Sequence, residues 1–109
     1  MSEPFVPAVQ TVYWVDTSIL PAGDAERQRA VVVVAAPKTT RGTVTVVARS
    51  GTDAFGVAHH AEPALGLSAP GRFSRRVPVQ GELWTPSVVA RSGLLDDSTF
   101  AAVVARFGW

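Results

Sequence analysis

The stretch that decides the fold consists of two segments: Val12-Tyr13-Trp14-Val15-Asp16, and Arg29-Ala30 followed by Val31-Val32-Val33-Val34. The first segment alternates, which is typical of a strand, whereas the second is continuously apolar and indicates a strand buried on both faces. A polar stretch containing Gly23 separates them. The sequence therefore predicts two strands joined by a loop that ends on Arg29.

Arg29 is expected where an exposed loop meets a buried strand, so the scaffold could hold its side chain against a ligand phosphate. Arginine stays charged at all physiological pH values and binds phosphate through two parallel hydrogen bonds. The alternative is that Arg29 pairs with Asp24 or Glu26 across its own loop, an exposed contact worth about 0–1 kcal/mol. The residues alone leave both interpretations open.

Composition restricts the class of protein. The chain has 109 residues, 47% hydrophobic and 17% charged, which fits one folded domain and excludes wholesale disorder. It has no cysteine, so disulfides and thiolate metal sites are excluded. We expect neither a signal peptide nor a membrane span, because no apolar run is long enough. The net charge of +1 is too small to require a nucleic-acid partner.

The rest of the chain predicts several short strands. Residues 1–10 contain two prolines and are expected to form a flexible arm, and residues 11–109 are expected to form one domain. Alternation and turn residues predict further strands at five places: Thr43–Arg49, Phe55–His60, Phe73–Val79, Glu82–Trp84 and Ser87–Val89. Pro86 separates the last two.

The last segment is predicted to be helical. Its apolar residues follow helical spacing, at Phe100, Val103, Val104 and Phe107, with Asp96 or Asp97 as the N-cap and Gly108 after the last turn. Many short strands followed by one terminal helix predict a mainly β protein with a small α portion, built as a strongly bent sheet or partly open barrel.

The order of these pieces resembles the PemK/MazF family of toxins, which are ribosome-independent mRNA interferases. The matching pieces are Val12–Asp16, Arg29–Val34, Thr43–Ser50 and the tail Ser92–Gly108. The resemblance implies an SH3-like barrel with a C-terminal helix that pairs as a homodimer in the cytoplasm. It also implies cleavage of single-stranded RNA without a metal or other cofactor, and inhibition by an acidic antitoxin segment.

Residue roles follow from the same resemblance. The family's catalytic arginine lies just before the second strand, which implies that Arg29 stabilises the reacting phosphate. Its hydroxyl partner follows the third strand, where this chain has Ser50. The family usually has proline and threonine where this chain has Ala30 and Ser50. The alternative to a catalytic role is that Ser50, next to Gly51, is a turn residue.

Other residues could contact RNA. The candidates for binding its backbone are Arg27, Arg49, Arg72, Arg75 and Arg76. For the last three the alternative is a solvated strand edge. Trp14, Phe55 and Phe73 could stack on bases, although we expect Trp14 and Phe73 to belong to the core.

His59 and His60 are adjacent, so on a strand they should point to opposite faces and cannot easily share a metal site. One of them could still act as a general acid. The alternative to a nuclease is a non-catalytic protein of the same fold, for example phage-encoded, that binds a host protein or binds RNA without cutting it.

Overall fold

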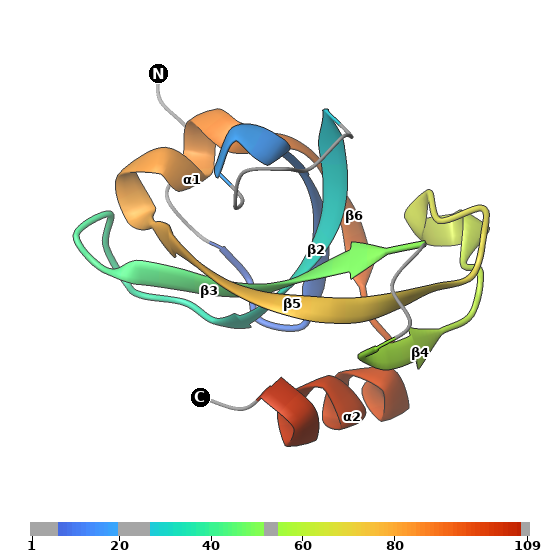
Figure 1. Cartoon of the computed structure of the whole chain (residues 1–109). Coiled ribbons are helices and arrows are strands. Elements are labelled where there is room, and N and C mark those ends of the chain that lie inside the picture. Colours follow the sequence, from blue (N-terminus) through green and yellow to red (C-terminus); the bar gives the residue numbers. More distant parts are fainter. Residues whose placement is uncertain (1–6, 20–26, 52–54, 108–109) are drawn as a thin grey trace.

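A computed structural model describes residues 7–19, 27–51 and 55–107, and its centre is one six-stranded antiparallel sheet (Figure 1). The strands lie in the order β4-β5-β3-β2-β1-β6. Their bounds are β1 Thr11–Asp16, β2 Gln28–Ala35, β3 Thr43–Ser50, β4 Val57–His59, β5 Gly71–Gln80 and β6 Val88–Leu94. Within the described ranges β4 and β6 are the two edges, and the pairings do not close the sheet into a barrel.

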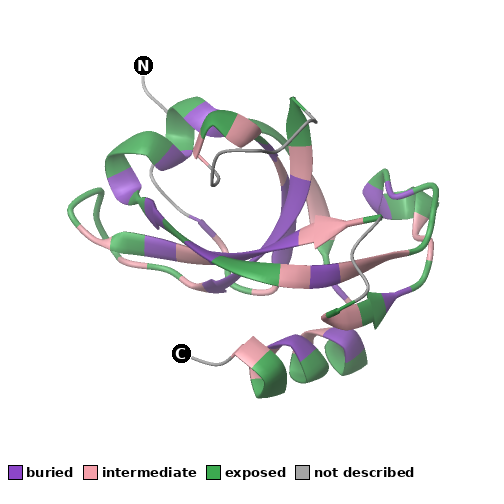
Figure 2. Cartoon of the chain, viewed as in Figure 1, coloured by how far each residue is buried: buried purple, intermediate pink, exposed green. Residues whose placement is uncertain are grey.

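The valine run in β2 is buried on both faces, as predicted, because the bent sheet separates two hydrophobic clusters. Val31 and Val33 belong to the cluster on one face, and Val32 and Val34 to the cluster on the other. All four are at most 2% exposed. Alternate side chains of the valine run therefore enter different cores, which is why residues 31–34 include no polar side chain. Figure 2 shows the buried positions running along the strands.

Short helices cover the two faces of the sheet. The first cluster is completed by Trp84 from α1 (Gly81–Ser87) and by Ile19 from the 3₁₀ turn η1 (Thr17–Ile19). The second receives Leu65 from η2 (Pro63–Leu65) and Val103 from α2 (Asp97–Phe107). Both layers are visible in Figure 1, where α1 and α2 lie on opposite sides of the strands.

Several predictions from the sequence are confirmed. The protein is mainly β with short helices, and the first predicted strand segment, Val12–Asp16, lies within β1. The terminal helix is present, and Asp96 caps it by accepting a hydrogen bond from the Thr99 backbone N–H at 2.9 Å. Val103 in its apolar stripe is fully buried. The predicted Gly108 cap lies outside the described residues.

The prediction of strands at Glu82–Trp84 and Ser87–Val89 was wrong for all of these residues except Val88 and Val89. Residues 81–87 form α1, and β6 begins only at Val88. The buried residues Gly81, Trp84 and Ser87 recur at every third position, and the Trp84 ring packs edge-to-face on Tyr13 with centroids 5.1 Å apart. Burial of this aromatic side chain outweighs the low helix propensity of Pro86.

The predicted strand Phe55–His60 was also too long, since β4 contains only residues 57–59. Gly56 has φ +106°, and a Cβ there would lie 2.3 Å from the Phe73 carbonyl oxygen. This backbone conformation is nearly restricted to glycine and interrupts the strand. Phe55 is 77% exposed.

Residues 1–6 of the predicted arm lie outside the described part of the structure. Gln10, the last residue of the predicted arm, is hydrogen-bonded to the folded domain. The Gln10 N–H donates to the Val33 carbonyl at 2.8 Å, and its side-chain amide donates to Asp97 at 2.7 Å. Across the described ranges, every helix is too short or too polar to cross a membrane.

Candidate functional site

The first candidate site is a hollow of about 200 Å³ where the ends of β2 and β3 meet β1. Its lining combines two arginines, an aromatic ring and small residues: Trp14, Gln28, Arg29, Ala30, Arg49, Gly51 and Leu67. Arg29 comes from the second position of β2, where pairing with Val15 of β1 fixes its backbone. This hollow is called the Arg29 pocket below.

The two arginines of the Arg29 pocket have different environments. Arg29 is partly exposed, and its Nη1 donates to the Arg49 carbonyl oxygen at 3.4 Å. Asp24 and Glu26, its alternative partners in the sequence, lie outside the described residues. Arg49 instead is held by the protein: its Nε donates to His59 Nδ1 at 3.0 Å, and its Nη2 donates to the Ala69 carbonyl at 2.7 Å. Burial lowers the pKa of Arg49, and the charge of Glu62 opposes that effect.

Trp14 is only half-buried, so the prediction that it is a core residue was incomplete. Its side chain packs against the second hydrophobic cluster and also lines the Arg29 pocket. Phe73, by contrast, is fully buried, as predicted. An aromatic ring next to two cations is an arrangement that can hold a nucleobase beside its phosphate.

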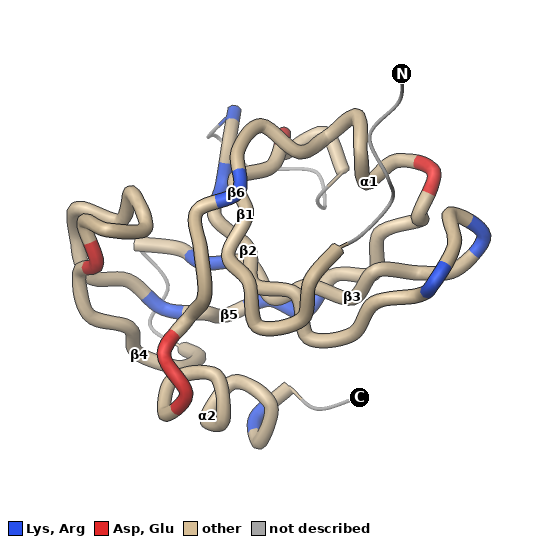
Figure 3. The backbone as a smooth tube through the Cα atoms, turned by 180° about the vertical axis from the view of Figure 1, so that it is seen from behind, with Lys and Arg blue, Asp and Glu red and all other residues tan. Residues whose placement is uncertain are grey.

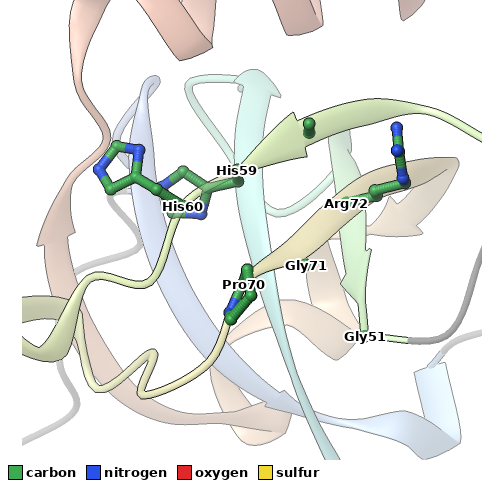
Figure 4. A pocket seen from close by; sticks show the side chains of 7 residues that line it. Gly51, His59, His60, Pro70, Gly71 and Arg72 are labelled. Carbon is green, nitrogen blue, oxygen red and sulfur yellow. The ribbon is translucent and has the colours of Figure 1, made fainter.

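A second hollow, of about 370 Å³, shares Gly51 with the Arg29 pocket. It is lined by Gly51, Ala58, His59, His60, Pro70, Gly71 and Arg72 (Figure 4). Arg72 is also linked to the protein, since its Nη1 donates to the Gly56 carbonyl at 3.4 Å. Three of the predicted arginines therefore lie around two hollows that adjoin at the end of β3.

Ser50 occupies the last position of β3, opposite Arg72 of β5. It is not among the described residues that line either hollow, although its neighbours Arg49 and Gly51 line the Arg29 pocket. Arg27, Arg75 and Arg76 are exposed, and they too are absent from the described lining of both hollows. The structure thus brings Arg29 and Arg49 together in one hollow, whose described lining does not include the other predicted site residues.

The expectation that His59 and His60 point to opposite faces was wrong. Their ring centroids lie 4.8 Å apart, and Figure 4 shows the two rings side by side. The reason is that β4 ends at His59, so the strand alternation does not extend to His60. Both histidines approach Glu62: its Oε1 lies 2.6 Å from His59 Nε2 and 3.3 Å from His60 Nε2.

His59 is poorly suited to be a general acid. Its side chain has no exposed surface, and both ring nitrogens are engaged, one by Arg49 and the other by Glu62. Sequence reasoning missed this Arg49–His59–Glu62 chain because β3, which carries Arg49, and the β4–η2 connection meet only in the folded protein. The available signal was His59, His60 and Glu62 within four positions.

No protein-family model matches the chain, and no curated protein matches it. The class that the structure itself defines is a mainly β protein, whose described residues form one bent antiparallel sheet and two short α-helices.

Proposed function

We propose that this protein is an endoribonuclease toxin that binds single-stranded RNA in the Arg29 pocket. The observation that carries the proposal is the position of Arg29, partly exposed at the start of β2, in one hollow with Arg49 and Trp14. The sequence resemblance to PemK/MazF toxins led to the same arginine. We further propose that the bent sheet and α2 correspond to the SH3-like barrel and terminal helix of that family, and that the protein acts as a cytoplasmic homodimer.

The proposed reaction needs an anion-stabilising group more than it needs a metal. The ribose 2′-oxygen forms a bond to phosphorus while the bond to the 5′-oxygen breaks, giving a cyclic phosphate and a 5′-hydroxyl. The 2′ proton passes to solvent, and the leaving 5′-oxygen takes up a proton. Negative charge builds on the equatorial phosphoryl oxygens, where a fixed guanidinium stabilises the transition state.

Other residues would bind the flanking nucleotides. Trp14 would stack on a base, an interaction worth about 1–3 kcal/mol. Arg72, in the adjoining hollow, would contact a neighbouring phosphate. Arg49 is already held by His59 and Ala69, so its proposed role is to fix the pocket wall that faces Arg29.

A second candidate function is RNA binding without cleavage. The observation that favours it is the absence of Ser50 from the described lining of the Arg29 pocket. The resemblance to PemK/MazF toxins implies that Ser50 is the hydroxyl partner of the catalytic arginine, so cleavage is expected to need Ser50 beside the phosphate. In this case the same arginines and Trp14 would hold intact RNA.

The test is to incubate purified protein with a long single-stranded RNA in the presence of a chelator. Metal-independent cuts that leave 5′-hydroxyl ends would support the nuclease, and retarded but intact RNA would support the binding protein. We expect Arg29→Ala to slow cleavage about 100- to 1,000-fold, the usual effect of removing one such donor. Arg91→Ala, an exposed arginine on β6, is the matched control and should cleave normally. Full cleavage by Arg29→Ala would refute the assignment.

A further inference from the structure

A second cluster of polar side chains lies where β4 ends beside the start of α2, and the hydrogen bond from Arg49 to His59 connects it to the Arg29 pocket. It consists of His59, His60, Glu62 and Asp96, each of which has one potential ligand atom within 4.8 Å of the other three. Figure 3 shows acidic positions near β4 and at the start of α2. Imidazole nitrogens and carboxylate oxygens are the ligands that zinc and similar divalent transition metals take in proteins.

Asp96 provides an independent sign that a cation belongs here. Its Oδ2 accepts three hydrogen bonds, from the Thr99 backbone, the Thr99 hydroxyl and the Ser98 hydroxyl, at 2.8–2.9 Å. Its Oδ1 is buried and has no hydrogen-bond partner, and lies 4.0 Å from His59 Nε2. An unpaired buried carboxylate oxygen is costly, and a bound cation would satisfy it.

Burial raises the pKa of the Asp96 carboxyl, but the hydrogen bonds from Thr99 and Ser98, together with His60, outweigh that effect and lower the pKa to about 2.

Arg49 determines which histidine can act as a ligand. A guanidinium N–H can only donate, so His59 Nδ1, which accepts from Arg49 Nε, must carry the lone pair. The neutral His59 ring then has its proton on Nε2, which donates to Glu62 Oε1 at 2.6 Å. His59 consequently has no nitrogen lone pair left for a metal. It orients the Glu62 carboxylate instead, as outer hydrogen-bond partners of metal ligands commonly do.

We propose that His60 Nε2, Glu62 and Asp96 Oδ1 bind a divalent transition metal such as Zn²⁺, with His59 positioning Glu62. His60 Nε2 and Glu62 Oε1 are 3.3 Å apart, about the spacing of two ligands around a tetrahedral zinc ion. The His60 side chain is 64% exposed and can turn towards Asp96. Three protein ligands leave the fourth position to water.

The metal would tie the end of β4 to the N-terminus of α2. His60 and Glu62 belong to the connection between β4 and η2, whereas Asp96 caps α2, so one ion would join segments that are distant in sequence. Such a link stabilises the folded state, because the unfolded chain does not hold the ligands together. The proposal does not depend on the proposed function, since its test uses no RNA.

The test is calorimetric titration of tag-free protein, first stripped with a chelator, with Zn²⁺. We expect saturable binding of one ion per chain, and a rise in Tm of roughly 10 °C at a hundredfold excess over Kd. His60→Ala and Asp96→Asn should each weaken binding about tenfold or more. Asparagine retains the helix cap, so Asp96→Asn should remain folded. Asp97→Asn, the same change one residue further along, is the matched control and should bind Zn²⁺ like the wild type.

Nitrogen NMR of the two imidazole rings separates ligand from positioning residue. On adding Zn²⁺, the His60 Nε2 resonance should move to a metal-bound position, while His59 Nε2 keeps its proton. The proposal is overturned if wild-type protein shows no saturable binding at millimolar Zn²⁺, or if His60→Ala and Asp96→Asn bind normally. It is equally overturned if Asp97→Asn loses binding to the same extent, or if His59 carries the metal-bound signal.

Discussion

Replacing Arg49 by methionine tests whether its hydrogen bonds hold this end of the sheet together. Methionine keeps an unbranched apolar stem but removes every donor. The most important loss is at His59 Nδ1, which accepts from Arg49 Nε at 3.0 Å, because the His59 side chain has no exposed surface and water cannot replace the donor. The Ala69 carbonyl is also released, but Ala69 is exposed and water can satisfy it.

The size of the effect follows from these two environments. A buried acceptor left without its donor costs about 1–3 kcal/mol, whereas a solvated one costs almost nothing. Removing a charge whose pKa is lowered by burial returns part of this cost. We therefore expect Arg49→Met to lower the free energy of unfolding by about 2 kcal/mol, equivalent to a fall in Tm of roughly 10 °C for a domain of this size.

The assay is urea and thermal unfolding in the presence of a chelator, with Arg91→Met as control. Arg91 is exposed on β6, so its replacement should change stability by less than about 0.5 kcal/mol. Nitrogen NMR should also show the His59 Nδ1 resonance shifting once Arg49 no longer donates to it, while Nε2 keeps the proton that Glu62 accepts. Wild-type stability together with an unchanged Nδ1 resonance would refute the role assigned to Arg49.

Three further predictions concern the fold and its charges. Phe73→Ala should cost about 3–5 kcal/mol in chemical denaturation, because Phe73 is fully buried, whereas Phe55→Ala, at a position 77% exposed, should leave the midpoint nearly unchanged. Gly56→Ala should lower Tm by more than about 10 °C, since the new Cβ would meet the Phe73 carbonyl and the positive φ disfavours alanine; an unchanged Tm would contradict this account of the turn. The low pKa of Asp96 stabilises the fold above about pH 4 and loses this contribution as pH falls towards 2. Because its side chain is 37% exposed, we discount the contribution to about 1 kcal/mol, so Asp96→Asn should be less stable by that amount at pH 7 but not at pH 2.

Features that depend on local periodicity could be predicted from the sequence. The position of β1, the doubly buried valine run and the capped helix after Asp96 each rest on a pattern contained in one segment. The helix α1 could not be predicted in this way. Its stability depends on Trp84 meeting Tyr13, a residue from the opposite end of the chain.

The candidate sites also depend on contacts between residues that are distant in sequence, which local patterns do not predict. Arg29 could be selected from its position before the valine run, but its neighbours in the pocket, Trp14 and Leu67, come from separate elements. The expectation for His59 and His60 assumed that strand alternation continues past residue 59, and the end of β4 there reverses the conclusion. Asp96 reaches the same cluster only because α2 contacts β4 in the folded chain.

The position of β6 beside β1 has a consequence for how the protein is made. Thr11 pairs with Leu94, so β1 lacks one neighbour until almost the whole sheet has left the ribosome. Contacts between residues so far apart slow folding, and the nascent chain must keep an unpaired edge soluble in the meantime. Completion of this sheet during translation is therefore timed by the synthesis of β6.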